Sequence, residues 1–321
     1  MPFELFDVTK LKLHPLSERV HDVSISTNIQ DCTSAERIDD VKFDRIAGAI
    51  HDARRANATV LMMYGAHVVR KGNSPVMIEL MKHGMVTHFA TNGAGAIHDF
   101  ELAMIGATCE SVAKYISEGQ FGLWQETGLL NEAVKSGDAE EIGFGEAVGK
   151  YIWENHFPNR EQSVLAMGYH LQVPCTVHIG FGNDIVHEHP NFDPGATGRS
   201  TYRDFLIYTK SIERIQDGVF LNFGSAVTGP EVYLKALAMA RNVAKQEGRK
   251  IDHITTAVFD MQTITEDVSE TPPKTDPRYY FRPWKTILSR TVADGGQSYY
   301  ICGDHRQTVP NLAMRLLGKE Q

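Results

Sequence analysis

Short runs of apolar residues alternate with longer amphipathic stretches along most of this chain. The short runs are continuously apolar, which is typical of parallel strands that are covered on both faces. The stretches between them have helical spacing, as in residues 39–57 and in residues 230–247, where Pro230 stands at the start. We predict strands at residues 58–64, 85–90, 173–180, 218–223, 253–259 and 298–302.

This alternation predicts an α/β protein with a doubly wound, mostly parallel, Rossmann-like sheet. Right-handed crossovers bring the carboxyl ends of such strands to one edge of the sheet, where ligands bind. Residues 284–292 (WKTILSRTV) are predicted as a further strand. Residues 201–215 are predicted as a helix that follows a long polar loop over residues 181–200.

The first 38 residues have a mixed pattern with two prolines and several polar clusters. We predict that residues 1–38 form an N-terminal arm with one or two short strands, which packs on another subunit. Residues 39–321 then form one nucleotide-binding domain, because no linker-like stretch divides them.

Residues 85–106 (MVTHFATNGAGAIHDFELAMIG) combine a predicted strand, a glycine-rich turn over residues 91–96 and a helix. Such a turn exposes backbone N–H groups, and the helix N-terminus favours negative charge. One interpretation is a nucleotide or phosphate site, and the other is a tight connection between strand and helix. The run GAGA does not satisfy the GxGxxG fingerprint, because the third glycine position is occupied by His98.

Composition narrows the classes of partner. The chain has 321 residues and a formal net charge of −8, which argues against nucleic acid or an anionic membrane as the main partner. We find neither a signal-peptide core nor an apolar stretch of membrane-spanning length. The four cysteines form no CxxC pair, which is typical of reduced thiols, so we expect a cytoplasmic protein.

Three groups of residues are candidates for chemistry. His98 and Asp99 follow the glycine-rich turn, where His98 could face a ligand and Asp99 could instead complement the helix dipole. His187, Glu188 and His189 permit a metal site, but loop histidines more often face a substrate or make hydrogen bonds, so we predict no metal.

The third group is Trp284 and Lys285. A lysine beside an indole ring is partly desolvated, which favours the neutral amine that Schiff-base chemistry needs. The alternative is a surface lysine that lies along the ring.

In chain order, these segments resemble the deoxyhypusine synthase family over roughly residues 40–317. The family's TTAGGxEED segment is similar to residues 91–99, and residues 65–86 look like its preceding segment. The other similar motifs are D-G-S-x-x-D at Asp193 to Gly195 with Asp204 further on, W-G-K-I at Trp284 to Ile287 without the glycine, and D-A-T/S-x-x-x-P at Asp304 to Pro310.

The resemblance implies an NAD-dependent homotetramer in which NAD oxidises an amine of spermidine and an aminobutyl fragment passes through a lysine imine. Carried over, Lys285 is the imine lysine and Asp204 lies in the polyamine pocket. The residues that would contact NAD are Thr91, Asn92, Gly93, Asp193 and Asp304.

This chain departs from the family at two places. The family's V-K-H-H-I-A-N-A segment, whose histidine assists amine oxidation, corresponds to residues 226–232, which hold Glu231 and no histidine. Its Glu-Glu-Asp corresponds to Ile97, His98 and Asp99. We therefore place Asp99, Trp284 and Glu231 with Asp204 on the substrate side, and His98 or His187 would supply the missing general base.

The sequence thus predicts an NAD-dependent transferase that acts on an amine or polyamine through Lys285. One alternative is an NAD-dependent oxidoreductase with no covalent step. A second is a metal-dependent hydrolase or lyase that uses residues 187–189, and a third is a nucleotide-binding regulatory protein without catalysis.

Overall fold

The computed structural model describes residues 3–33 and 35–318, so the predictions for residues 1, 2, 34 and 319–321 lie outside it. Its strands are β1 (Val23–Ser24), β2 (Val60–Tyr64), β3 (His88–Asn92), β4 (Ala107–Thr108), β5 (Cys175–His178), β6 (Val219–Phe223), β7 (Thr255–Asp260) and β8 (Gln297–Cys302).

The helices begin and end as follows. The α-helices are α1 (Val41–Arg55), α2 (Ala66–Arg70), α3 (Ser74–Lys82), α4 (Gly93–Ile105), α5 (Val112–Ser117), α6 (Leu129–Ala139), α7 (Phe144–Glu154), α8 (Val164–Leu171), α9 (Pro194–Glu213), α10 (Thr228–Gln246), α11 (Arg290–Ala293) and α12 (His305–Leu317). The short 3-10 turns are η1 (Val8–Lys10), η2 (Leu16–Glu18), η3 (Glu126–Gly128), η4 (Arg160–Gln162), η5 (Ile185–Glu188) and η6 (Pro277–Tyr280), and η7 (Trp284–Ser289) is a π-helix.

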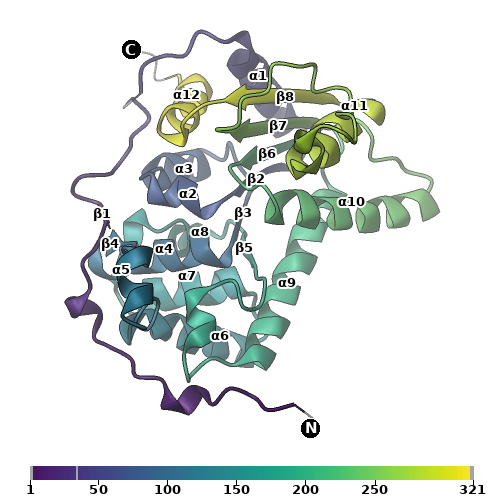
Figure 1. The fold of residues 1–321 in the computed structure, drawn as a ribbon. Helices are drawn as coiled ribbons and strands as arrows, with labels where there is room; N and C mark the ends of the chain where they lie inside the picture. The colour runs from purple at the N-terminus through teal and green to yellow at the C-terminus, as the bar shows by residue number, and fades with distance from the viewer. Residues whose placement is uncertain (1–2, 34, 319–321) are drawn as a thin grey trace.

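A parallel sheet of six strands, in the order β5-β3-β2-β6-β7-β8, forms the centre of the molecule (Figure 1). The first strand of this sheet, β2, lies in the middle. The next two strands are added on one side of it, and the last three on the other side. In chain order this is the 3-2-1-4-5-6 arrangement of dinucleotide-binding sheets, whose direction of winding reverses between the first and fourth strands. The predicted α/β class with a mostly parallel sheet is confirmed.

Both faces of the sheet are covered, which explains why the central strand β2 is apolar at every position. Met62 and Tyr64 of β2 pack in a core with α1, α3, α4, α8 and α12. Leu61 and Met63 point to the opposite face and pack with α9, α10 and η7. A strand with two buried faces loses the polar alternation of a half-exposed strand.

The prediction of a turn over residues 91–96 is wrong. β3 continues to Asn92, and α4 begins directly at Gly93. The side chain of Asn92 accepts a hydrogen bond from the N–H of Gly95 at 3.0 Å. This cap lets the helix begin without an intervening loop, so the glycines form its first turn.

The long polar loop predicted over residues 181–200 is also wrong in its second half. α9 begins at Pro194, and the carboxylate of Asp193 accepts hydrogen bonds from the N–H groups of Gly195 and Ala196. An aspartate cap followed by proline at the first position starts a helix even in a polar, glycine-containing stretch.

The strand predicted over residues 284–292 is wrong, because these residues are helical in η7 and α11. They connect β7 to β8, which pair in parallel. Neighbouring parallel strands need a crossover connection, and here this connection supplies Ile287 and Leu288 to the second core. The apolar residues of this segment are buried, but their spacing is that of a helix and not of a strand.

The N-terminal residues cross the body of their own chain. β1 pairs antiparallel with β4, which confirms one short strand. Arg19 makes two hydrogen bonds to the carboxylate of Glu101 on α4, at 2.8 and 2.7 Å, and both side chains are 1% exposed. The expected contact with another subunit stays a prediction.

In the described part of the chain, no helix is long and apolar enough to cross a membrane.

The Arg19–Glu101 pair gives a first testable prediction. Glu101→Gln leaves the guanidinium of Arg19 buried without a counter-charge, so the free energy of unfolding should fall by about 3–5 kcal/mol in urea denaturation. Glu213→Gln, which removes an exposed ion pair with Lys210, serves as the control and should cost less than about 1 kcal/mol. Equal losses in the two variants would show that the buried pair does not hold the arm.

Candidate functional site at the carboxyl edge of the sheet

Three turns meet where the sheet reverses its winding, at the carboxyl ends of β2, β6 and β8. Gly65 follows β2, and a Cβ added to it would lie 2.4 Å from the carbonyl oxygen of Gly224. Gly224 follows β6 with a φ of +59°, and a Cβ there would lie 2.5 Å from Nε2 of His305 on α12. Neither glycine tolerates a side chain, because the two turns and His305 pack directly against one another at this point.

Positive charge gathers at the same edge, although the chain as a whole is acidic. Burial lowers the pKa of His67, and the charges of Lys71, Arg70 and Arg306 lower it further, while only Asp304 raises it. Lys71 and Arg306 lie 3.9 and 3.1 Å from the carboxylate of Asp304. Two cations therefore share the Asp304 carboxylate, and Arg70 is a third cation near His67.

His67 and His305 lie against each other there, with ring centroids 6.3 Å apart. Burial is the main reason why the pKa of His305 falls to about 4, with the neighbouring His67 as the next cause. Both rings are consequently favoured in the neutral form at pH 7, in which a ring nitrogen accepts a hydrogen bond.

The N-terminus of α4, where the sequence suggested a phosphate site, is already capped. Asn92 bonds to the N–H of Gly95, and the carboxylate of Asp184 accepts from the N–H of Ala94. Thr91 is fully buried and donates to the carbonyl oxygen of Tyr64. An anion at this terminus would meet the Asp184 carboxylate.

Gly93 is the residue that admits Asp184 to this position. A Cβ on Gly93 would lie 2.1 Å from Oδ2 of Asp184, an oxygen that is buried without a hydrogen-bond partner. Burial raises the pKa of Asp184 to about 6. His187 lies beside it, with Nε2 3.9 Å from Oδ2.

His98 and Asp184 line one cavity of about 350 Å³ beside α4. Burial lowers the pKa of His98 to about 4, so its imidazole is neutral at pH 7. The predicted general bases His98 and His187 thus lie on either side of Asp184. The other residues of the cavity wall are Arg19, Arg70, Ala94, Ile97, Glu101, Cys109, Glu110, Val112, Phe121, Asn183 and Ile185.

Asp99 points away from this cavity. Its carboxylate accepts hydrogen bonds from the Ser163 hydroxyl and from the N–H groups of Val164 and Leu165, so it caps α8. Burial raises its pKa to about 6, although these three donors favour the ionised form. The side chain joins α4 to α8.

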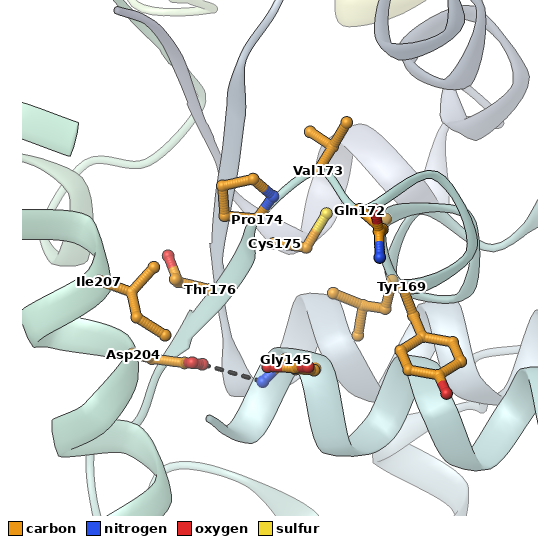
Figure 2. Close-up of a pocket in the computed structure, with 12 residues that line it drawn as sticks. Gly145, Tyr169, Gln172, Val173, Pro174, Cys175, Thr176, Asp204 and Ile207 are labelled. Carbon is orange, nitrogen blue, oxygen red and sulfur yellow. Dashed lines mark hydrogen bonds between the residues drawn. The ribbon is translucent and has the colours of Figure 1, made fainter. Parts of the chain in front are cut away.

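Asp204 has a similar position on the other side of β5. One of its carboxylate oxygens accepts from the N–H groups of Gly145 and Val177, at 2.9 and 2.7 Å, which ties α7 and the edge strand β5 to α9. Figure 2 shows it at one end of a separate cavity of about 340 Å³, opposite Tyr169 and Gln172. Burial raises the pKa of Asp204 to about 8.

Lys285, Trp284 and Glu231 lie at α10 and η7, apart from the cavity that contains His98. The ammonium of Lys285 donates to the hydroxyl of Tyr279 and lies 4.3 Å from the centre of that ring. The indole of Trp284 is buried and donates to the carbonyl oxygen of Glu270, so Tyr279 rather than Trp284 is the aromatic partner of the lysine. Glu231 pairs with Arg282 and Lys235.

The three residues of the suggested metal motif have separate partners. His187 accepts from the N–H groups of Gly182 and Asp184, and Nε2 of His189 bonds to the carbonyl oxygen of Gly122. Within residues 3–33 and 35–318, no group of three or more histidine, cysteine, aspartate or glutamate side chains is placed to hold a metal ion.

The residues at the carboxyl edge fit a dinucleotide. Gly65 and Gly224 let the turns after β2 and β6 lie in direct contact at the reversal of the sheet. Lys71 and Arg306 would complement phosphate charge, and Asp304, which is one-third exposed, would accept from a hydroxyl. A bound NAD would supply a hydride acceptor at this edge.

Sequence reasoning missed several of these groups. Arg19 is 82 residues from Glu101, and no local pattern connects them. Arg70 and Glu110 belong to none of the candidate motifs in the sequence. The pair of His67 and His305 had a weak signal, because both residues follow predicted strands of one parallel sheet.

No family model and no curated protein sequence matches this chain. Among solved structures, it is similar to the ternary complex of AgrE with ornithine and NAD+ (TM-score 0.53, 12% identity, 89% of this chain and 34% of that one). It is also similar to a LOR/SDH protein from Methanococcus maripaludis S2 (TM-score 0.50, 13% identity, 90% of this chain and 72% of that one).

A deoxyhypusine synthase structure from Entamoeba histolytica matches with a TM-score of 0.45 and 8% identity over 88% of both chains. This TM-score is too low to bear on the family prediction, which stays a prediction. The present chain spans about a third of the length of AgrE. At these identities, the similarities to AgrE and the LOR/SDH protein support the fold alone.

Asp184 gives a second testable prediction. Its pKa is about 6 in the folded protein against an ordinary value of 3.8, so its stabilising contribution is fully present below about pH 4 and is lost as the pH rises through about 6. Asp184→Asn keeps one side-chain oxygen that can cap α4 and cannot ionise. Relative to the native chain, the variant should gain roughly 2 kcal/mol in free energy of unfolding between about pH 4.5 and about pH 8. A stability difference that does not change with pH would contradict the raised pKa.

Proposed function

We propose that this chain is an NAD-dependent enzyme that acts on an amine. The observation that carries the proposal is the reversal point of the sheet, where Gly65 and Gly224 lie in contact and Lys71 and Arg306 pair with Asp304. In sheets of this order, dinucleotides bind across the reversal point, and positive charge there favours a pyrophosphate. The similarity to AgrE, whose structure was solved with ornithine and NAD+, agrees with this proposal.

The proposed position of the dinucleotide differs from the one that the sequence suggested. Because Asp184 and Asn92 already cap α4, the phosphates are better matched by the turns after β2 and β6. The predicted cofactor residues Thr91, Asn92 and Gly93 would then shape the edge, and Asp304 would be the direct contact. Asp193 caps α9 and would act from the neighbouring strand end.

The finer proposal is transfer of an alkylamine fragment through an imine on Lys285. The bond between Lys285 and Tyr279 supports it, since a phenol oxygen that accepts from the ammonium can orient that group. Plain oxidation of the amine without a covalent step is the second candidate. It is favoured because neither Lys285 nor its partner Tyr279 is among the residues that line the cavity of His98. A homotetrameric assembly remains part of the proposal.

Binding of NAD+ gives a third prediction. Exchanging both Lys71 and Arg306 for Gln should weaken NAD+ binding about tenfold in isothermal titration calorimetry and reduce its dependence on salt concentration. Lys210→Gln, which removes an exposed charge on α9, should leave the affinity unchanged. If the native chain does not bind NAD+, the proposed function is wrong. If NAD+ binds equally well to the double variant, only the proposed position is wrong.

The imine gives a fourth prediction. Incubation with NAD+ and either spermidine or ornithine, followed by borohydride, should add the mass of the oxidised amine fragment to the peptide that contains Lys285, because borohydride reduces an imine to a stable secondary amine. Lys285→Arg should abolish both labelling and turnover, whereas Lys250→Arg, at an exposed position, should change neither. Turnover that survives Lys285→Arg without labelling would exclude the covalent step and leave the oxidoreductase.

A further inference from the structure

The cavity beside α4 has an apolar body and a polar end. Its apolar wall comes from four separate elements and consists of Ile97, Val112, Phe121 and Ile185. At the polar end lie His98, Glu110 and Asp184. A volume of about 350 Å³ is at the lower end of the range for small-molecule sites, so the cavity suits a short organic molecule with one polar terminus.

A buried chain of hydrogen bonds determines which nitrogen of His98 carries the proton. Arg19 holds Glu101, which accepts a hydrogen bond from the Thr108 hydroxyl at 2.7 Å. Burial alone would raise the pKa of Glu101, but the hydrogen bonds and charge of Arg19, together with the hydrogen bonds from Thr127 and Thr108, outweigh it and lower this pKa, so the carboxylate is ionised and can only accept.

The hydroxyl of Thr108 therefore donates its hydrogen to Glu101. The Thr108 oxygen lies 2.8 Å from Nδ1 of His98 and must accept there, which places the ring proton on Nδ1. In the described part of the chain, no group forms a hydrogen bond with Nε2, and this nitrogen is not enclosed by protein. The network thus presents a bare ring nitrogen in the wall of the cavity.

Once the buried Arg19–Glu101 pair is set aside, the cavity wall holds more negative than positive charge. The charge of Arg19 is neutralised by Glu101. Glu110 accepts one hydrogen bond at each oxygen, from Gly122 and Trp124, and keeps further lone pairs. With Asp184 on the opposite side, two carboxylates line the polar end, and the unpaired cation of the wall, Arg70, is exposed at its surface.

We propose that this cavity binds the ammonium group of a short alkyl amine, which donates a hydrogen bond to Nε2 of His98 while its carbon chain packs on the apolar wall. Glu110 and Asp184 supply the compensating charge, and Thr108 is a positioning residue that holds the tautomer of His98. The site rests on the proposed function only in that the amine would be its substrate. Its binding can be measured without any dinucleotide.

Other ligands fit the cavity less well. A phosphate or carboxylate would meet two carboxylates and a ring nitrogen that has no proton to donate. A neutral alcohol could bond to Nε2 but would leave the carboxylates uncompensated. The order of affinity expected from the wall is therefore amine, then alcohol, then carboxylate.

The experiment, which is the fifth prediction, compares n-butylamine, n-butanol and butyrate as probes of the full chain at pH 7. In calorimetric titration without NAD+, butylamine should bind at least tenfold more tightly than either of the other probes. The Nε2 resonance of His98 in 15N-histidine-labelled protein should shift with butylamine and stay in place with butyrate. Equal binding of the three probes, or an unmoved resonance, would overturn the proposal.

Two variants and a control separate binding from folding. His98→Asn retains a donor toward Thr108 but lacks Nε2, so it should weaken butylamine binding about tenfold at unchanged melting temperature. Thr108→Val should let the proton of the His98 ring move between its two nitrogens. The 15N spectrum of the ligand-free protein reports this change of tautomer even if the affinity for butylamine changes little. His83→Asn, at an exposed position, should alter neither readout.

A competition titration separates this site from the dinucleotide site. If the inference is correct, NAD+ and butylamine bind at the same time. If NAD+ binds but displaces butylamine mole for mole, the cavity belongs to the dinucleotide and the amine site is wrong, while the proposed function stands. If NAD+ does not bind and butylamine does, the proposed function fails and the amine site stands.

Discussion

The buried carboxylate of Glu101 connects more of this molecule than any other polar group described above. It accepts from Arg19 in the N-terminal residues, from Thr108 after α4 and from Thr127 in η3. An ionised carboxylate this deep is tolerated only when its charge is paired and its oxygens are bonded, and here four segments of the chain meet to satisfy it. The tautomer of His98 and one wall of the cavity beside α4 both depend on this arrangement.

A second constraint is the winding of the sheet. Parallel strands end at one edge, and because the first strand lies in the middle, the turns after β2 and β6 are neighbours although they are about 160 residues apart. This neighbourhood brings Gly65 against Gly224 and collects cations around Asp304. The binding properties of the edge come from this order of strands rather than from a fingerprint sequence.

The predicted acidic residues illustrate how burial changes a role. Asp99 and Asp204 were expected near a substrate, yet each carboxylate accepts backbone N–H groups at the start of a helix and joins separate layers. These hydrogen bonds give each of the two residues a structural function of its own. Asp184 combines both features, since it caps α4 and also lines a cavity.

The sequence by itself determined the layered α/β class and the parallel sheet, because continuous apolar runs such as residues 60–64 reflect burial on two faces, which is a local property of each strand. It also identified His98, His187 and Asp304 as candidate site residues. It misjudged residues 284–292, because apolar β-branched residues are compatible with either a strand or a buried helix.

Only the tertiary structure decided which of these polar residues share a site. The links from Arg19 to Glu101 and from Thr108 to His98, like the contact between Gly65 and Gly224, join elements whose separation along the chain carries no local signal. Hydrogen bonds and charge pairs act over a few ångströms, so the protonation of His98 and the openness of the edge follow from packing. Neither can be inferred from composition or spacing.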